Sequence, residues 1–143
     1  MVNKQRRKGT DWENTFVHLI EDNVKNSIVK RIATSGAIGT ALEEPLLQGD
    51  VVAKFTGFPK KFRFECKTGY GGSKQLAVKK EWLDKISEEA KNANSYPAVA
   101  CKFTGAKQGT KYFIILDIDT FCDIINYVNN IKLLYDREVD SCK

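Results

Sequence analysis

A short stretch in the middle of the chain alternates strictly between apolar and charged side chains. Positions 62 to 67 read Phe-Arg-Phe-Glu-Cys-Lys. Successive side chains of a β-strand point to opposite faces, so this pattern predicts a strand with two chemically different faces. One face carries Phe62, Phe64 and Cys66, and the other carries Arg63, Glu65 and Lys67.

A β-prone run at Asp50–Phe55 precedes this strand, and the residues between the two runs include a glycine and a proline. This arrangement predicts a β-hairpin. A hairpin centred between Gly57 and Phe58 places Asp50 opposite Glu65, whereas a register centred one residue later opposes Asp50 to Lys67. In both registers, two carboxylates and a lysine converge on one patch of sheet.

Hydrophobic periodicity predicts the other elements. Trp12 and Phe16 begin an apolar stripe at helical spacing, and Thr10 with Glu13 matches a capping box at its start. Asp119 is placed to cap the last helix. The predicted elements are helix Thr10–Lys25, strand Ile28–Ala33, the two hairpin strands, helix Leu76–Ala93, strands Pro97–Phe103 and Tyr112–Asp117, and helix Thr120–Tyr135. The order α-β-β-β-α-β-β-α implies an α/β fold, with a mixed central sheet flanked by helices.

The chain has 143 residues, 42% of them hydrophobic, which predicts one folded domain over residues 1–143. We expect residues 1–9 to form a basic flexible arm and residues 136–143 to form a frayed tail. No apolar run approaches the roughly 20 residues that span a bilayer. We therefore expect no membrane partner and a location in the cytoplasm of a bacterial, archaeal or phage-infected cell, or elsewhere inside a cell with DNA.

The net charge of +5 is unevenly distributed. Residues 1–53 are neutral overall, although a basic cluster lies near the amino terminus. Residues 54–80 carry a net +7, and residues 81–143 carry −2. The basic middle segment favours a surface that attracts a polyanion, and a solvated lysine-rich surface is the alternative.

Several kinds of catalytic site are disfavoured by composition. His18 is the only histidine and lies far from any serine-centred motif, which argues against a Ser-His-Asp hydrolase. The four cysteines form no closely spaced pair, so a structural zinc site is not expected. Reduced cysteines packed as small apolar residues are expected instead.

The composition instead favours a site built from carboxylates. Asp50 and Glu65 on adjacent strands can hold a hard cation such as Mg²⁺ against a phosphate. Lys67, two residues after Glu65 on the same face, can orient a water or offset negative charge. The alternative is that Glu65 and Lys67 are ordinary strand residues and that Asp50 belongs to a turn.

The string Gly49-Asp50-Val51-Val52 followed by Glu65-Cys66-Lys67 resembles the PD-(D/E)xK nuclease signature, with Gly49 in place of the proline. Further matches are the segment 8–13 (KGTDWE), Arg31, and the segment 35–37 (SGA). Together these residues resemble the archaeal-type Holliday junction resolvases, which some phages and viruses also carry. The resemblance spans roughly residues 6 to 82 and implies a restriction-endonuclease-like fold.

This resemblance implies the site and its partners. The catalytic set would be Glu13, Ser35, Asp50, Glu65 and Lys67. The metal would be Mg²⁺, with Mn²⁺ able to substitute, held by Asp50, Glu65, the backbone carbonyl of Cys66, and Glu13 through water. A homodimer would make paired symmetric nicks across a four-way junction. From the resemblance and the charge pattern together, the expected DNA contacts are Lys4, Arg6, Arg7, Lys8, Arg31, Lys60, Lys61, Lys74, Lys79 and Lys80.

Competing interpretations stay open at this stage. Glu13 is equally explained by the capping box, and Ser35 by a turn. The apolar residues of the last helix are either core or dimer interface. The same site also suits a restriction- or repair-type nuclease that acts on duplex or branched DNA, and a non-catalytic DNA-binding module is a further alternative.

Overall fold

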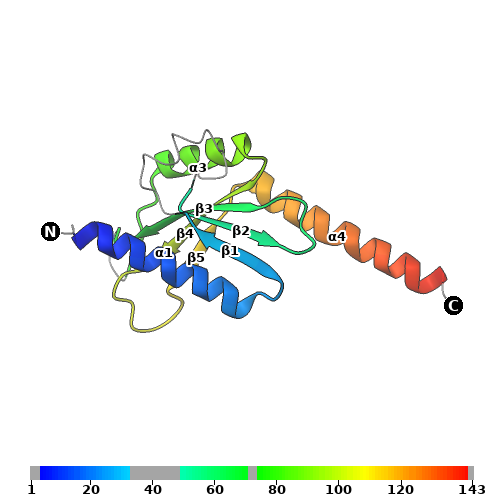
Figure 1. The fold of residues 1–143 in the computed structure, drawn as a ribbon, viewed down its shortest axis with the longest axis horizontal. Helices are drawn as coiled ribbons and strands as arrows, with labels where there is room; N and C mark the ends of the chain where they lie inside the picture. The colour runs from blue at the N-terminus through cyan, green and yellow to red at the C-terminus, as the bar shows by residue number, and fades with distance from the viewer. Residues whose placement is uncertain (1–3, 33–48, 71–73, 142–143) are drawn as a thin grey trace.

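The computed structural model describes residues 4–32, 49–70 and 74–141. The elements, in chain order, are α1 (Lys4–Asn23), β1 (Ser27–Arg31), β2 (Val51–Phe55), β3 (Phe62–Thr68), α3 (Lys80–Asn92), β4 (Tyr96–Lys102), β5 (Tyr112–Ile115) and α4 (Ile118–Ser141). Their order over the described residues is the predicted one, and Figure 1 shows their arrangement.

The five strands form one mixed sheet in the order β1-β2-β3-β4-β5. Strands β3 and β4 are parallel, and the other neighbouring pairs are antiparallel. A parallel pair needs a crossover connection, which α3 supplies between β3 and β4. The predicted α/β class with a mixed sheet is confirmed.

The hairpin adopts the first of the two predicted registers. Val51 pairs with Phe64, and Val52 pairs with Arg63. Asp50 directly precedes this ladder, and its amide donates to the Phe64 carbonyl at 2.9 Å. The start of β2 therefore lies beside the end of β3, where Glu65 and Lys67 are found.

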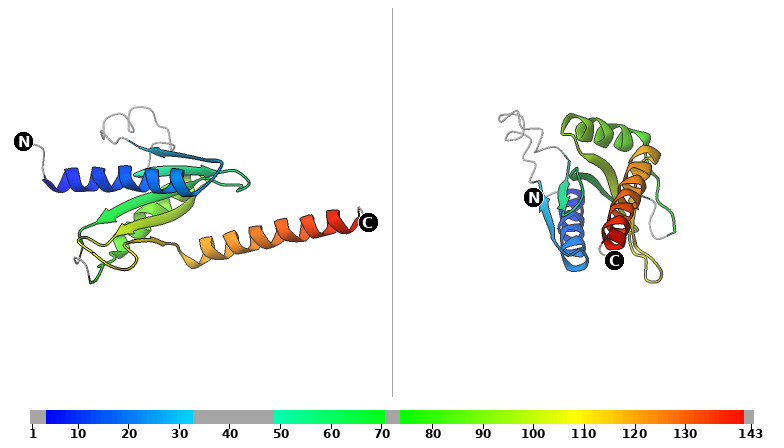
Figure 2. Two further views of the ribbon diagram at one scale, coloured as in Figure 1. Left: turned by 90° about the horizontal axis from the view of Figure 1, so that it is seen from below. Right: turned by 90° about the vertical axis from the view of Figure 1, so that its right-hand side faces the viewer.

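Helices α1 and α3 pack on the sheet and bury its two faces (Figures 1 and 2). The core on the α1 side includes Trp12, Phe16 and Phe64, and the indole Nε1 of Trp12 donates to the Ala100 carbonyl at 3.1 Å. The core on the α3 side centres on Ile86 and Val99. The alternation along β3 is as predicted, since Phe62, Phe64 and Cys66 all belong to the first core.

Helix α1 begins at Lys4, six residues before the predicted start. The segment that we expected to be a flexible arm is therefore helical from Lys4 onward, and Thr10 lies within the helix rather than at its cap. The residues Lys4 to Lys8 are all Lys, Gln or Arg, which favour helix. These intrinsic preferences outweigh the local capping signal.

Helix α4 is 24 residues long and leads away from the sheet (Figure 2, left). Its cap is Asp117, whose carboxylate accepts from the Thr120 amide at 2.7 Å and the Thr120 hydroxyl at 2.9 Å. The predicted cap, Asp119, is thus wrong, and helical structure continues through most of the segment expected to be frayed. In the described part of the chain, no helix combines the length and apolarity needed to cross a bilayer.

Candidate active site

A polar cavity of about 520 Å³ lies where β3 ends, β2 begins and the amino-terminal half of α1 passes. The hairpin register brings the two strand ends together, and α1 packs across them. The described residues that line the cavity are Lys8, Gly9, Thr10, Glu13, Arg31, Asp50, Cys66, Lys67, Thr68, Gly69 and Tyr70. Four of the predicted catalytic and metal-binding residues, Glu13, Asp50, Cys66 and Lys67, thus meet in one place, whereas Glu65 is buried and is not part of the lining.

Asp50 occupies an electrostatically unfavourable position in the cavity. Burial raises the pKa of its carboxyl to about 6, and the negative charges of Glu65 and Glu13 add to this rise. The Cys66 amide donates to Asp50 Oδ2 at 2.7 Å, and this hydrogen bond partly offsets the rise in pKa. A cation bound beside Asp50 would relieve the remaining cost.

Gly49 explains why this chain departs from the proline of the signature. Its φ is +87°, a region that glycine adopts readily and that a proline ring, fixed near −65°, cannot reach. Gly49 is buried, and a Cβ there would make only ordinary contacts at 3.6 Å with the Phe64 carbonyl and the Ile86 side chain, so the positive φ and not a lack of space favours glycine. The turn into β2 that delivers Asp50 therefore requires glycine.

Glu65 is 3% exposed, and both carboxylate oxygens are occupied. The ammonium of Lys67 lies 2.6 Å from Oε1, and that of Lys85 lies 3.0 Å from Oε2. Lys67 also packs its ammonium 5.2 Å from the Trp82 ring centroid, and Tyr70 meets the same ring edge-on. Two cations thus neutralise a carboxylate that α3 and its flanking loop cover.

Lys85 was not anticipated from the sequence. It comes from α3, twenty residues after Glu65, and the only local pattern it forms is the i,i+4 pair with Glu89. The hydrogen bond with Glu65, together with the charges of Glu65 and Glu89, raises the pKa of Lys85, although burial alone acts in the opposite direction. Only the packing of α3 on β3 reveals this contact.

Glu13 does not close a capping box, because Thr10 is not a cap. Its Oε2 instead accepts from Arg31 Nε at 2.7 Å, so α1 and β1 are joined at the cavity wall. The Glu13 side chain is only 18% exposed. This placement joins a third carboxylate and a guanidinium to the group around Asp50.

The remaining predicted residues fall into three groups. Ser35 lies outside the described residues, as do the side chains of Lys4 and Arg6, whereas Arg7 is exposed beside Lys8. Lys79 lies near the site, 5.9 Å from the Trp82 ring, while Lys80 pairs with Asp84 and Lys74 is exposed. Lys60 and Lys61 precede β3 and are not near the site, since six steps along the strand separate Lys61 from Lys67 by roughly 20 Å.

The donor set fits a hard divalent cation that keeps much of its water. In the described part of the chain, no three Asp, Glu, His or Cys side chains are grouped as a ready metal site. Asp50 and Glu65 nevertheless interact electrostatically, and Mg²⁺ in proteins is commonly held by one or two carboxylates with several waters retained. Burial keeps the Cys66 side chain in the core and raises its thiol pKa, so only its backbone is suited to the cavity.

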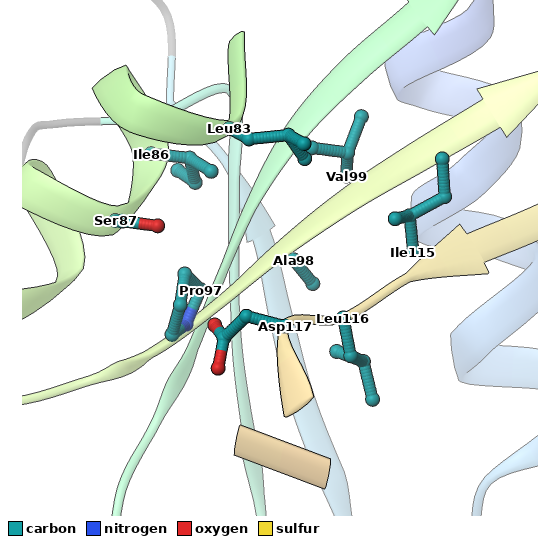
Figure 3. A pocket seen from close by; sticks show the side chains of 9 residues that line it. All are labelled: Leu83, Ile86, Ser87, Pro97, Ala98, Val99, Ile115, Leu116 and Asp117. Atoms are coloured by element: carbon teal, nitrogen blue, oxygen red, sulfur yellow. The ribbon is translucent and has the colours of Figure 1, made fainter. Parts of the chain in front are cut away.

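A second cavity of about 70 Å³ lies between α3, β4 and the end of β5 (Figure 3). Its walls are mainly apolar, with Leu83, Val99 and Ile115 among them. The one carboxylate there, Asp117, already caps α4. This cavity therefore offers little for chemistry.

Comparisons with known proteins identify the family and the fold. A family model described as "Phage putative PDDEXK endonuclease" matches residues 4–138. Among solved structures, the chain is similar to Hjc from Archaeoglobus fulgidus, a Holliday junction resolvase from an archaeal hyperthermophile, with a TM-score of 0.52 and 16% identity. That match covers 74% of this chain and 73% of the other, and at such identity it shows a shared fold. No curated protein matches the chain in sequence.

Proposed function

The chain belongs to the PDDEXK family of phage endonucleases, and we propose that it is a Mg²⁺-dependent nuclease that resolves four-way DNA junctions by paired nicks. The observation that carries the proposal is the cavity at which Glu13, Asp50 and Lys67 meet, with Lys8 and Arg31 also in its lining and with the buried Glu65 in contact with Lys67. The basic residues of the lining favour the binding of a polyanion. The acidic residues beside them can hold the metal ion that its cleavage would need.

Asp50 and Glu65 would hold the metal, with the Cys66 carbonyl as a third ligand and Glu13 acting through water. Bound there, Mg²⁺ supplies an activated water and neutralises charge on the phosphate in the transition state. The Cys66 amide orients Asp50, and Arg31 orients Glu13. Each carboxylate that would face the cation is thus fixed by a donor from a neighbouring element.

Lys67 lines the cavity and is our candidate for the group that positions the attacking water. Its ammonium is held between Glu65 and the Trp82 ring, which restricts its movement. A fixed positive charge beside the reacting phosphate also stabilises negative charge that develops in the transition state.

DNA would be held through its phosphates. Arg7 is exposed, and Lys8 lines the cavity five residues before Glu13 on α1. No helix-turn-helix or zinc-finger motif is found in the sequence, so recognition would depend on backbone and junction shape. Binding is therefore expected to weaken steeply as salt rises.

Paired nicks require two sites, and we propose that a second copy packs on the exposed apolar face of β5 and α4. Eight large apolar side chains there are each at least 40% exposed, and together they offer on the order of 800 Å², the area each partner buries in a standard interface. A patch this large is unusual on a monomer. The residues are Ile114, Ile118, Phe121, Ile125, Val128, Ile131, Tyr135 and Val139.

The test is cleavage of a synthetic four-way junction, labelled on each strand in turn, with Mg²⁺, with Mn²⁺ and with EDTA. We expect symmetric nicks in either metal and none in EDTA. Asp50→Asn and Glu65→Gln should bind the junction within about threefold of wild type while losing at least about 10³-fold in cleavage rate. Cleavage by these variants at the wild-type rate would contradict the metal site.

The same assay distinguishes the alternatives. Equal cleavage of a linear duplex of the same sequence would instead indicate a restriction- or repair-type nuclease. Junction binding without nicking in either metal would indicate a non-catalytic DNA-binding module. The fold likeness to a junction resolvase supports the branched substrate, since the shared fold extends over nearly three quarters of both chains.

A further inference from the structure

Glu65 is held by two ammonium groups that differ in their freedom to move. The Lys67 side chain is 18% exposed, comes from the same strand as Glu65, and is packed against Trp82. The Lys85 side chain is 53% exposed and lies on the surface of α3. Of the two cations on Glu65, Lys85 is the one that can leave without disturbing the core.

A second carboxylate lies within reach of Lys85. Glu89 follows one turn later on α3, and its Oε1 is 3.8 Å from the Lys85 ammonium. The Glu89 side chain is 18% exposed, and the Gly49 backbone and the positive charge of the buried Arg63 also stabilise its carboxylate, but its Oε2 is buried without a hydrogen-bond partner among the residues that the structure describes. Glu89 is thus an acceptor whose hydrogen-bonding capacity is incompletely used.

A divalent cation that binds Glu65 needs at least one of its oxygens, and both oxygens are occupied by ammonium groups. We propose that Lys85 is an exchangeable counter-ion: it neutralises Glu65 while the metal site is empty and moves to Glu89 when a divalent cation takes its place. Lys67 stays on Glu65 throughout. This inference rests on the proposed function, because it assumes that Glu65 is a metal ligand.

The exchange makes Lys85 a positioning residue that competes with the metal. Its contact fixes the Glu65 carboxylate and stabilises the metal-free protein. The same contact must be broken before the cation binds, so it lowers the affinity for metal. The transfer to Glu89 recovers part of the lost interaction and keeps an ammonium from remaining unpaired beside a divalent cation.

The experiment is calorimetric titration of the DNA-free protein with Mn²⁺ at pH 8. Lys85→Met keeps the aliphatic stem and removes the charge, and it should bind Mn²⁺ at least about fivefold more tightly than wild type. Lys85→Arg keeps the charge and should bind within about twofold of wild type. Lys91→Met, an exposed position on the same helix, is the matched control and should also resemble wild type.

Glu89→Gln tests the second half of the exchange. It should weaken Mn²⁺ binding several-fold when Lys85 is present, because the displaced ammonium loses its acceptor. In the Lys85→Met background the same substitution should have a clearly smaller effect. A double-mutant cycle across these four proteins measures the coupling.

The outcomes separate this inference from the proposed function. If wild type binds no Mn²⁺, both the proposed metal site and the proposed exchange of Lys85 are contradicted. If wild type binds Mn²⁺ and Lys85→Met binds equally or more weakly, the metal site stands and the role of Lys85 is overturned. The role of Lys85 would also be overturned if Lys85→Arg bound Mn²⁺ as tightly as Lys85→Met. It would be overturned as well if Glu89→Gln changed the Mn²⁺ affinity by the same factor with Lys85 present and in the Lys85→Met background.

Discussion

Two regions of this molecule depart from the usual distribution of side chains, and they do so in opposite directions. At the cavity, carboxylates are buried: Glu65 is 3% exposed, and burial raises the Asp50 pKa to about 6. On β5 and α4, large apolar side chains such as Leu134 and Tyr135 are at least 60% exposed. Folding normally avoids both arrangements, because each leaves groups in an unfavourable environment.

The two departures point to two different kinds of partner. A bound cation would stabilise the buried carboxylates, and the basic residues that line the same cavity favour a polyanionic ligand. Exposed apolar area calls for another protein surface. The core between them is ordinary, with Trp12 and Phe64 packed in the usual way. The following predictions test whether each departure serves a partner or is simply tolerated.

The largest expected effect concerns Lys67. Lys67→Ala should lower the rate of junction cleavage by about 10² to 10⁴, the usual contribution of a positioned acid–base group. Stability should change much less, because Lys85 still neutralises Glu65. Single-turnover cleavage and thermal melting measure the two quantities separately.

The matched control for Lys67→Ala is Lys54→Ala, an exposed lysine in the neighbouring strand β2. It should cleave like wild type. If Lys67→Ala lost stability in proportion to activity, the ammonium would be structural, and the buried charges of the cavity would require no catalytic explanation.

The second prediction concerns Asp50 in the metal-free protein. The folded-state pKa of about 6 lies above the usual 3.8, so the folded protein binds the proton more tightly than the unfolded chain. Stability is therefore lost as pH rises from about 4 through 6, by up to about 3 kcal/mol. Asp50→Asn stays neutral, so at pH 8 in EDTA it should be more stable than wild type by up to that amount.

Chemical denaturation at pH 8 and at pH 4 checks the prediction for Asp50. The gain from Asp50→Asn should vanish at pH 4, where wild-type Asp50 is itself protonated. The exposed Asp84→Asn should change stability by less than about 0.5 kcal/mol at either pH. An Asp50→Asn protein that was less stable at pH 8 would mean that the carboxylate is favourable where it lies.

The contrast between the regions also explains what the sequence could predict. Alternation from Phe62 to Lys67, with a turn before it, predicts a hairpin locally, but it leaves two registers open, and the strand pairing in the structure decides between them. The Glu65–Lys85 contact depends on how α3 lies on β3, which no local pattern encodes. Likewise, Ile125 and Val128 share a helical stripe, but only the structure shows that they are exposed.

Capping signals failed for a related reason. Thr10 with Glu13 fits a capping box, yet α1 starts at Lys4, and Glu13 contacts Arg31 across the cavity wall. The pattern around Glu13 has two physical explanations, a capping box and a contact with another element. The sequence cannot decide between them, because the contact that decides is with Arg31, 18 residues away along the chain. Asp117 and Asp119 are both plausible caps by type, and the direction in which the chain enters α4 decides between them.

The third prediction tests the apolar face. Phe121→Asp combined with Val128→Asp places two charges on the stripe and should weaken self-association by at least about 100-fold, which converts to about 2.7 kcal/mol. Sedimentation equilibrium over a range of protein concentrations measures this. The variant should keep the fold, because both side chains are about half exposed.

The control for the apolar face adds the same two charges elsewhere on the helix. Asn126→Asp with Asn130→Asp lies on the opposite side of α4, where both residues are exposed, and should self-associate like wild type. A wild-type protein that is monomeric at all concentrations would contradict the proposed dimer and leave the apolar face of α4 without a role.

The smallest expected effect is at the start of α4. Asp117→Ala removes the carboxylate that accepts from the Thr120 amide and hydroxyl, which should cost about 1 kcal/mol of stability. Asp117→Asn retains an acceptor and should recover most of it, whereas Asp119→Ala should change little. Because α4 begins beside the sheet and then leaves it, its cap fixes the helix only at its base. The loss should therefore reduce global stability while leaving Mn²⁺ binding at the cavity unchanged, and a change in metal affinity would show that the two regions are coupled.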